Sequence, residues 1–297
     1  MKNFHGNGRT SSFFEGWYLK HQKGTDVLAF IPGMQVGPDG KKEAFIQIIT
    51  DQKSYYLPFA YTQFKAHPSR FAVCIGKSVF SERGVKLDID TPEVRCTGTV
   101  HYGAFVPPKT PMMGPFALKS MQCNHEILSL YHPLRGRITL NGRTYELSGG
   151  SGYIEKDWGT SFPKEYLWMQ CGGFLGRDNC VMASVADVPV GRGSFLGCIC
   201  SVYYQDREYR LATYRGARVL YWDSDGLFVK QGSYRLMAEV LKQTPQELRA
   251  PQFGAMSRTI REGLCCRARV SFYVGTRKRF DFITERASFE YVTRKRL

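Results

Sequence analysis

Two carboxylates that lie two residues apart are the feature of this sequence best suited to chemistry. They are Glu155 and Asp157, within the run GYIEKDWGTSFP at 152–163. If this run is a β-strand, alternation places Tyr153, Glu155 and Asp157 on one face, with the two carboxylates about 7 Å apart. On a buried face, desolvation and mutual repulsion would raise the pKa of at least one of them and leave a proton donor near neutral pH. The alternative is that both carboxylates face water or pair with arginines.

A second association of carboxylate, glycine and tryptophan occurs near the start of the chain. The run FEGWYLK at 14–20 contains Glu15 and Trp17, which would share one face of a strand. In the later run, Ile154, Lys156 and Trp158 would share the face opposite to the carboxylates. The recurrence of the pattern predicts two similar β units.

The units are expected to follow one another along the chain. Trp17 and Trp168 each lie in the strand that would open a unit, and the glycine-rich stretch 149–152 falls between them. This interpretation predicts domains at 1–150 and 151–297.

Histidine supplies a further candidate in the run MQCNHEILSLYH at 121–132. His125 and His132 have opposite parity, and the helical His-Glu-x-x-His spacing is absent, so no metal site is expected. On an uninterrupted strand His125 would share a mixed face that suits either a pocket or a core with a hydrogen-bonded imidazole. The other members of that face would be Cys123, Ile127, Ser129 and Tyr131.

The elements that must position these residues are mostly strands. Aromatic residues make up 14% of the 297 residues, and short β-branched runs end at turn residues throughout. Asn141-Gly142 between alternating flanks predicts a type I′ hairpin. The run 234–242 fits helix and strand, and its apolar stripe favours strand, whereas the proline-rich segment 105–115 is expected to be irregular. The fold class expected is all-β.

The net charge of the chain indicates which kinds of partner it could bind. Forty-one basic and 26 acidic side chains give +15, with short basic runs at 277–279 and 294–296. Such a balance is typical of a solvated basic face, and it also suits peripheral contact with an anionic membrane. No zinc-finger spacing, RNA-binding aromatic motif or basic zipper accompanies the charge, so no nucleic-acid partner is expected.

Other signals point to a cytoplasmic protein without a cofactor. The nine cysteines are odd in number and lie in apolar surroundings, which indicates buried thiols. The amino terminus lacks an apolar signal-peptide core, and the longest uncharged strip, 193–205, is too short to span a bilayer. No nucleophile elbow, phosphate loop or dinucleotide loop is found, so no cofactor is expected.

Several ordered blocks together resemble the tocopherol cyclase family. They are the run 14–20, the run CNHEILSLYHPLRG at 123–136, the run 152–163 with Trp168, and LRAPQFGAMSRTI at 248–260. The resemblance implies an all-β fold of two lipocalin-like antiparallel β-barrel or sandwich units packed together, with little helix.

The resemblance also implies a reaction. Plant members close a chromanol ring by protonating a prenyl double bond, after which a phenolic oxygen adds to the cation. Such an enzyme needs an acid and aromatic walls but no redox cofactor. Glu155 or Asp157 would be the acid, and His125 a proton partner. The substrate-binding residues would be Glu15, Trp17, Tyr153, Trp158 and Trp168.

Two functions remain open at this point. One is a cyclase or hydratase that acts by acid catalysis on a prenylated quinol or other isoprenoid-like apolar substrate. The other is a non-catalytic carrier that binds a lipid or prenylquinone and uses its basic surface to approach membranes. A buried acid favours the enzyme, whereas carboxylates that face solvent or pair with arginines favour the carrier.

Overall fold

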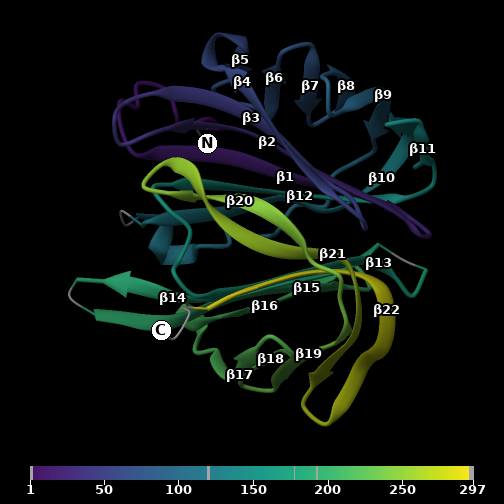
Figure 1. Cartoon of the computed structure of the whole chain (residues 1–297). Helices are drawn as coiled ribbons and strands as arrows, with labels where there is room; N and C mark the ends of the chain where they lie inside the picture. Colours follow the sequence, from purple (N-terminus) through teal and green to yellow (C-terminus); the bar gives the residue numbers. More distant parts are fainter. Residues whose placement is uncertain (1–2, 119–120, 177, 192, 294–297) are drawn as a thin grey trace. The chain divides into compact units, whose positions relative to one another are not determined.

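Strands make up most of the chain, as expected from its composition (Figure 1). The computed structural model describes residues 3–118, 121–176, 178–191 and 193–293, so the basic run at 294–296 lies outside the described residues. In the described part, the helical elements are three short 3-10 turns, η1 (Tyr61–Gln63), η2 (Gly114–Leu118) and η3 (Thr213–Arg215). None of them is long and apolar enough to cross a membrane.

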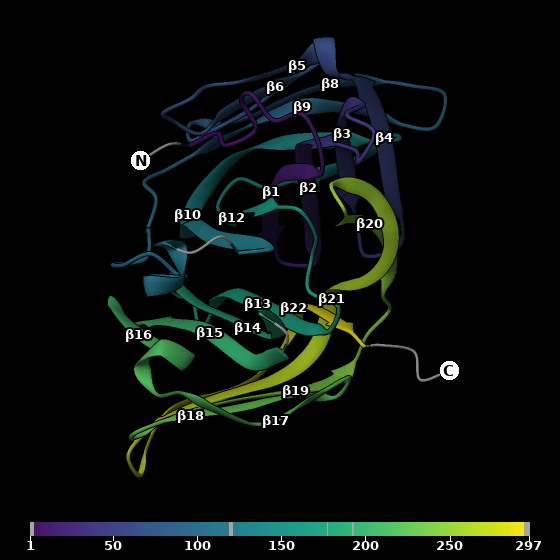
Figure 2. The same cartoon turned by 90° about the vertical axis from the view of Figure 1, so that its left-hand side faces the viewer.

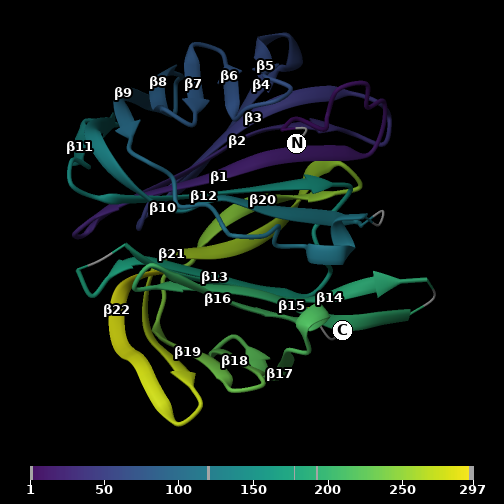
Figure 3. The same ribbon diagram turned by 180° about the vertical axis from the view of Figure 1, so that it is seen from behind.

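The first sheet has twelve antiparallel strands in the order β4-β3-β2-β1-β12-β10-β9-β8-β7-β6-β5, with β11 beside β10. Its central strands β1, β12 and β10 lie side by side (Figures 2 and 3). The strands are β1 (Phe13–Lys23), β2 (Asp26–Val36), β3 (Lys42–Ile49), β4 (Ser54–Ala60), β5 (Phe64–Ala66), β6 (Ala72–Ile75), β7 (Ser78–Ser81), β8 (Gly84–Asp90), β9 (Arg95–Tyr102), β10 (Cys123–Leu140), β11 (Arg143–Glu146) and β12 (Ser151–Gly159).

The second sheet has ten strands in the order β16-β15-β14-β13-β22-β21-β19-β18-β17, with β20 beside β21. The described pairings close neither sheet into a ring, so each is sandwich-like. The strands are β13 (Tyr166–Phe174), β14 (Asn179–Val190), β15 (Gly193–Tyr204), β16 (Arg207–Ala212), β17 (Arg218–Asp223), β18 (Gly226–Gln231), β19 (Tyr234–Lys242), β20 (Gln246–Gln252), β21 (Ala255–Val274) and β22 (Arg277–Val292).

Two local predictions are confirmed. Asn141 and Gly142 join β10 to β11 and have φ values of 49° and 86°. A type I′ turn requires positive φ at both central positions, so these values agree with the predicted hairpin. Tyr234–Lys242 is a strand throughout.

The two compact units differ from the consecutive domains 1–150 and 151–297 that we expected. Unit 1 comprises Met1–Pro107, Cys123–Phe162 and Leu248–Thr259, and unit 2 comprises the rest. The difference arises at β12, which lies after residue 150 and still pairs with β1 and β10 in the first sheet.

The two tryptophan-containing motifs therefore belong to one unit. Glu15 of β1 lies directly opposite Trp158 of β12, and Gly16 lies opposite Asp157. The run at 152–163 therefore does not open unit 2, whereas Trp17 and Trp168 do lie in the first strand of unit 1 and of unit 2, respectively. The strand order nevertheless repeats, because β13 in unit 2 holds the place that β1 holds in unit 1. Each unit has its own apolar core, which includes Trp17, Leu19 and Ile154 in unit 1.

Candidate functional site

The candidate site lies on β12 and β10, at the centre of the first sheet. Alternation along β12 places Tyr153, Glu155 and Asp157 on one face, as the sequence predicted, and neighbouring strands supply the residues opposite them. Asp157 lies opposite His125 of β10, and Glu155 lies opposite Ile127. The register of β10 thus brings an imidazole to the paired carboxylates.

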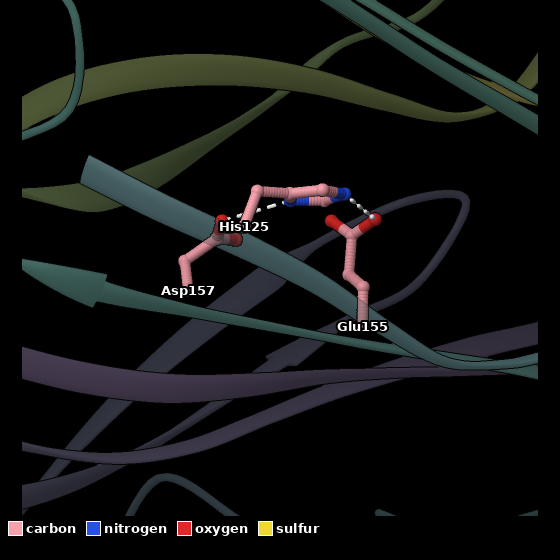
Figure 4. Close-up of side chains that lie close together, drawn as sticks. All are labelled: His125, Glu155 and Asp157. Carbon is pink, nitrogen blue, oxygen red and sulfur yellow. Dashed lines mark hydrogen bonds and ion pairs between the residues drawn. The ribbon is translucent and has the colours of Figure 1, made fainter. Parts of the chain in front are cut away.

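The imidazole of His125 lies between the two carboxylates (Figure 4). Its Nδ1 is 2.9 Å from Oδ1 of Asp157, and its Nε2 is 3.7 Å from Oε2 of Glu155. Nε2 is buried and has no hydrogen-bond partner among the described residues. The side chain retains 12% of its exposure, and that of Asp157 retains 20%. One ring nitrogen is therefore fixed by a hydrogen bond, while the other remains available for a further partner.

The charges around His125 favour its protonated form. Burial alone would lower the pKa of the imidazole, but the carboxylates of Asp157 and Glu155, together with the hydrogen bond to Asp157, outweigh burial and raise the pKa to about 9. The ring is thus an imidazolium at neutral pH, with both nitrogens acting as donors. His125 is therefore a candidate proton donor beside Glu155 and Asp157, which the sequence predicted for that role.

Tyr153 extends the site along β12. Its hydroxyl donates a hydrogen bond of 2.5 Å to Oε2 of Glu155, and the tyrosine and the glutamate are 2% and 5% exposed. This bond fixes the carboxylate that faces Nε2 of His125. Asp157, His125, Glu155 and Tyr153 therefore form a continuous polar chain across two strands.

Two neighbours flank Glu155; Tyr18 was missed in the sequence, and Ile127 was predicted there only as a member of the face of His125. Tyr18 of β1 is buried directly opposite Glu155, and Ile127 of β10 is buried opposite the same residue from the other side. Both lie in blocks of the family resemblance, but only the strand register shows that they flank the glutamate.

Cys123 lies near the carboxylates but is not suited to act as a nucleophile. Burial raises the pKa of its thiol well above the ordinary value, and the charges of Asp157 and Glu155 raise it further. Because the thiolate is the nucleophilic form, the protonated thiol is unreactive at neutral pH.

A metal ion is a weaker fit to the site than a proton. Ligand atoms of His125, Glu155 and Asp157 lie within 4.8 Å of one another. The two carboxylates, however, approach opposite nitrogens of one ring, and a metal would have to displace the proton that their charges favour. This donor set holds a proton between two anions.

Glu15 lies on the opposite face of the sheet and makes other contacts. It is fully buried, accepts hydrogen bonds of 2.7 and 3.0 Å from the backbone N–H groups of His5 and Gly6, and lies 3.7 Å from Nζ of Lys156. Lys156 is also 3.4 Å from Glu126. These contacts anchor the amino-terminal segment.

The predicted tryptophans are not gathered at the carboxylates. Trp17 is buried in the core of unit 1, and Trp158 stacks on the ring of His5 on the face that carries Glu15. Trp168 is a buried residue of β13 in unit 2. Of the predicted aromatic walls, Tyr153 shares the face of Glu155 and Asp157.

The expected face of β10 needs one correction. The strand has register shifts between Ile127 and Ser129 and between Ser129 and His132. Because a bulge reverses the alternation, Ser129 leaves the face of His125 and its hydroxyl lies 2.9 Å from Nδ1 of His132. The prediction that Ser129 lines the same face as His125 was wrong, whereas the separation of His125 from His132 is confirmed.

Part of the site, Tyr153, Glu155 and Asp157, lies within the range matched by a family model, whereas His125 lies two residues before that range begins. The family model for tocopherol cyclase-like proteins matches residues 127–291, more than half of the sequence. The chain belongs to the tocopherol cyclase-like family. A probable chloroplastic tocopherol cyclase of Oryza sativa subsp. japonica is 26% identical over 92 residues, and the chloroplastic tocopherol cyclase of Zea mays is 25% identical over 130 residues. These matches cover 30% and 40% of this chain but 19% and 27% of the plant proteins.

Solved structures share the fold of this tocopherol cyclase-like protein. Kievitone hydratase from Nectria haematococca has a TM-score of 0.53 at 13% identity, over 95% of this chain and 89% of that one. CghA with Sch210972 has a TM-score of 0.57 at 9% identity, over 95% and 88%. At these identities the likeness shows the fold alone, and it agrees with the expected lipocalin-like architecture.

Proposed function

We propose that this protein is a cofactor-independent cyclase or hydratase that acts on an isoprenoid-like apolar substrate, such as a prenylated quinol. The observation that carries the proposal is the position of His125 between Asp157 and Glu155. Family membership supports a cyclase or hydratase role, and the names of its relatives, tocopherol cyclase and kievitone hydratase, suggest the substrate classes.

His125 would act as the acid through Nε2. Asp157 fixes the ring through Nδ1 and stabilises its positive charge, as an orienting carboxylate does in other acid–base pairs. Transfer of the Nε2 proton to one carbon of a double bond would leave a tertiary cation on the other carbon. The carboxylate of Glu155, 3.7 Å from Nε2, would stabilise that cation.

An oxygen nucleophile would complete the reaction. A phenolic hydroxyl of the substrate would close a ring, or a water molecule would give an alcohol, and the O–H proton would return to the neutral imidazole or to Glu155. Cyclisation is then an isomerisation, and hydration adds one water. Neither route changes an oxidation level overall, so the residues named suffice for the proton transfers.

The alternative function is a carrier, which would bind its ligand beside His125 without converting it. Glu155 is buried, Asp157 is partly buried, and both carboxylates are engaged by His125. This arrangement favours the enzyme over the carrier.

Deuterium incorporation from the solvent tests the proposed reaction. Molecules that co-purify with the protein from its host should be identified by mass spectrometry, and each should be incubated with fresh protein in deuterated water, together with a synthetic prenylated hydroquinone. We expect a cyclised or hydrated product that carries one non-exchangeable deuterium at the protonated carbon. Ligand recovered without deuterium and without change of mass would contradict the enzyme and support the carrier.

A matched pair of variants separates chemistry from folding. His125→Gln removes the proposed acid, whereas His101→Gln changes an exposed histidine of β9 in the same unit. Deuterium incorporation should be lost in the first variant and kept in the second.

A further inference from the structure

We propose that the outer face of the β17–β18–β19–β21–β22 part of unit 2 docks onto an anionic phospholipid membrane. The face is defined by two neighbouring rows of side chains, which run across the strands. One row is basic and the other is apolar. This inference does not rest on the proposed reaction, because membrane docking and catalysis are measured separately.

The basic row follows from the strand register. Arg218 of β17 lies directly opposite Lys230 of β18, which lies opposite Arg235 of β19. The row continues through Tyr273 of β21 to Lys278 of β22. Like charges directly opposite one another destabilise a sheet, so three successive cations are costly unless an anion lies over them.

No carboxylate of the described residues offsets the first three cations. None lies within ion-pair distance of Arg218, Lys230 or Arg235, whereas Lys278 is 3.3 Å from Asp281. Arg235 donates to the carbonyl of Gly275 and lies over the ring of Tyr273, 4.9 Å from its centroid. Uncompensated cations in a line are suited to phosphate groups from outside.

The apolar row lies beside the basic one on the same face. Tyr221, Phe228 and Met237 follow one another across β17, β18 and β19, and Tyr221 and Met237 are 45% and 43% exposed. A register shift between Val219 and Tyr221 makes Leu220 an extra residue of β17, and Leu220 is 51% exposed. Three large apolar side chains are therefore exposed next to the cations.

The acidic groups of this face lie beyond the basic row, although Asp223 reaches the apolar row and accepts a hydrogen bond from the hydroxyl of Tyr221. Asp223 and Glu239 lie one row beyond the apolar side chains, at the positions that pair with Gly226. Asp281, at the end of the apolar row, is held by Arg269 at 2.8 Å and by Lys278. The free positive charge is thus concentrated along Arg218, Lys230 and Arg235.

The basic row and the apolar row together favour an anionic bilayer as the partner. A free phosphate would satisfy the cations but leave the apolar row in water, and a nucleic-acid duplex offers a charged backbone with no apolar layer beneath it. A bilayer of anionic lipids provides both, with phosphate groups at the surface and hydrocarbon directly below them.

The test uses co-sedimentation with vesicles of two compositions. We expect the whole protein to bind vesicles of phosphatidylcholine mixed with phosphatidylglycerol, to bind pure phosphatidylcholine vesicles much less, and to be released by salt. The double variant Lys230→Gln and Arg235→Gln should bind anionic vesicles roughly thirty-fold more weakly, since each surface cation contributes roughly five-fold.

Matched controls keep the test decisive. Lys65→Gln with Lys86→Gln removes the same charge from exposed strand positions of unit 1 and should leave vesicle binding nearly unchanged. Leu220→Ser with Met237→Ser should weaken binding roughly tenfold, while Phe253→Ser, also at an exposed position, should not. Circular dichroism of every variant verifies folding.

Three results would overturn the proposal. They are equal binding to both vesicle compositions, equal losses in the unit 1 and unit 2 charge variants, and salt-sensitive binding to duplex DNA without vesicle binding. Loss of vesicle binding with turnover of a soluble substrate intact would leave the proposed reaction standing.

Discussion

Units 1 and 2 share a strand order but differ in the chemistry of their side chains. In each unit the last strand of the sheet in sequence lies between the first strand and a long one. β12 lies between β1 and β10 in unit 1, and β22 lies between β13 and β21 in unit 2. All six histidines, however, lie in segments of unit 1: His5, His21, His67, His101, His125 and His132. The repeated architecture therefore carries imidazole side chains in one unit only.

The corresponding strands show what the imidazole adds. In unit 1 the hydroxyl of Tyr153 donates to Glu155, and in unit 2 that of Tyr166 donates to Glu290 at 2.8 Å. Both glutamates are buried. The residue opposite Glu290 on β21 is another glutamate, Glu262, whereas β10 brings His125 to the unit 1 pair. A buried tyrosine–glutamate pair belongs to both units, and the imidazolium distinguishes the proposed site.

Removing the imidazole is expected to have the largest effect. His125→Gln should lower kcat/KM for the substrate identified by the isotopic test by at least roughly 100-fold, because a general acid contributes that much or more. Glu290→Gln, in unit 2, should change it less than about threefold. Equal losses in the two variants would remove the distinction between the units.

Asp157→Asn should have the next largest effect, because it removes a charge that raises the pKa of His125. In the wild type, kcat/KM should be constant at neutral pH and fall as the pH rises through about 9. In the variant the fall should begin at lower pH, with about tenfold less activity at neutral pH. An unchanged pH profile would mean that Asp157 does not control the proton.

The charge of His125 should also affect folding stability. Its folded-state pKa of about 9 exceeds the ordinary 6.5, so the stabilisation is complete below pH 6.5 and is lost as the pH rises toward 9. The free energy of unfolding of the wild type minus that of His125→Gln should shrink by up to about 3 kcal/mol across this range. Denaturant titrations at several pH values measure it, and a difference that grows with pH would contradict the assigned charge.

The smallest effect is expected from a matched pair of tyrosine variants. Tyr153→Phe and Tyr166→Phe each remove one hydrogen bond to a buried glutamate, so each should cost about 1 kcal/mol of stability. Tyr153→Phe should also lower kcat/KM several-fold, whereas Tyr166→Phe should leave it unchanged. A larger loss of activity from Tyr166→Phe would place chemistry in unit 2.

The local features of the fold could be predicted because they depend on nearby residues. Alternation along 153–157 fixed the shared face of the two carboxylates, and Asn141-Gly142 fixed a hairpin. The pairing of β12 with β1 could not be predicted in this way, since it joins residues that are 129 to 145 positions apart in the sequence. The compact units therefore differed from the expected domains.

The sequence predicted which residues form the candidate site but not how they are arranged. Glu155, Asp157, Tyr153 and His125 lie together, but the side chain that holds the proton depends on a register that places His125 opposite Asp157. The position of Ser129 depended on a bulge that has no marker in the sequence. Alternation along one strand predicts which of its side chains share a face. The pairing between strands decides which side chains of neighbouring strands lie together.

NMR titration of the imidazole side chains measures the protonation state of His125, on which the proposed reaction depends. We expect one histidine that titrates near pH 9 and is absent from the spectrum of His125→Gln. Buried His21 and His132 should remain neutral at pH 6.5, because burial lowers the pKa of both, that of His21 to about 3. If His125 instead titrates at or below pH 6.5, it is not the imidazolium proton donor described here.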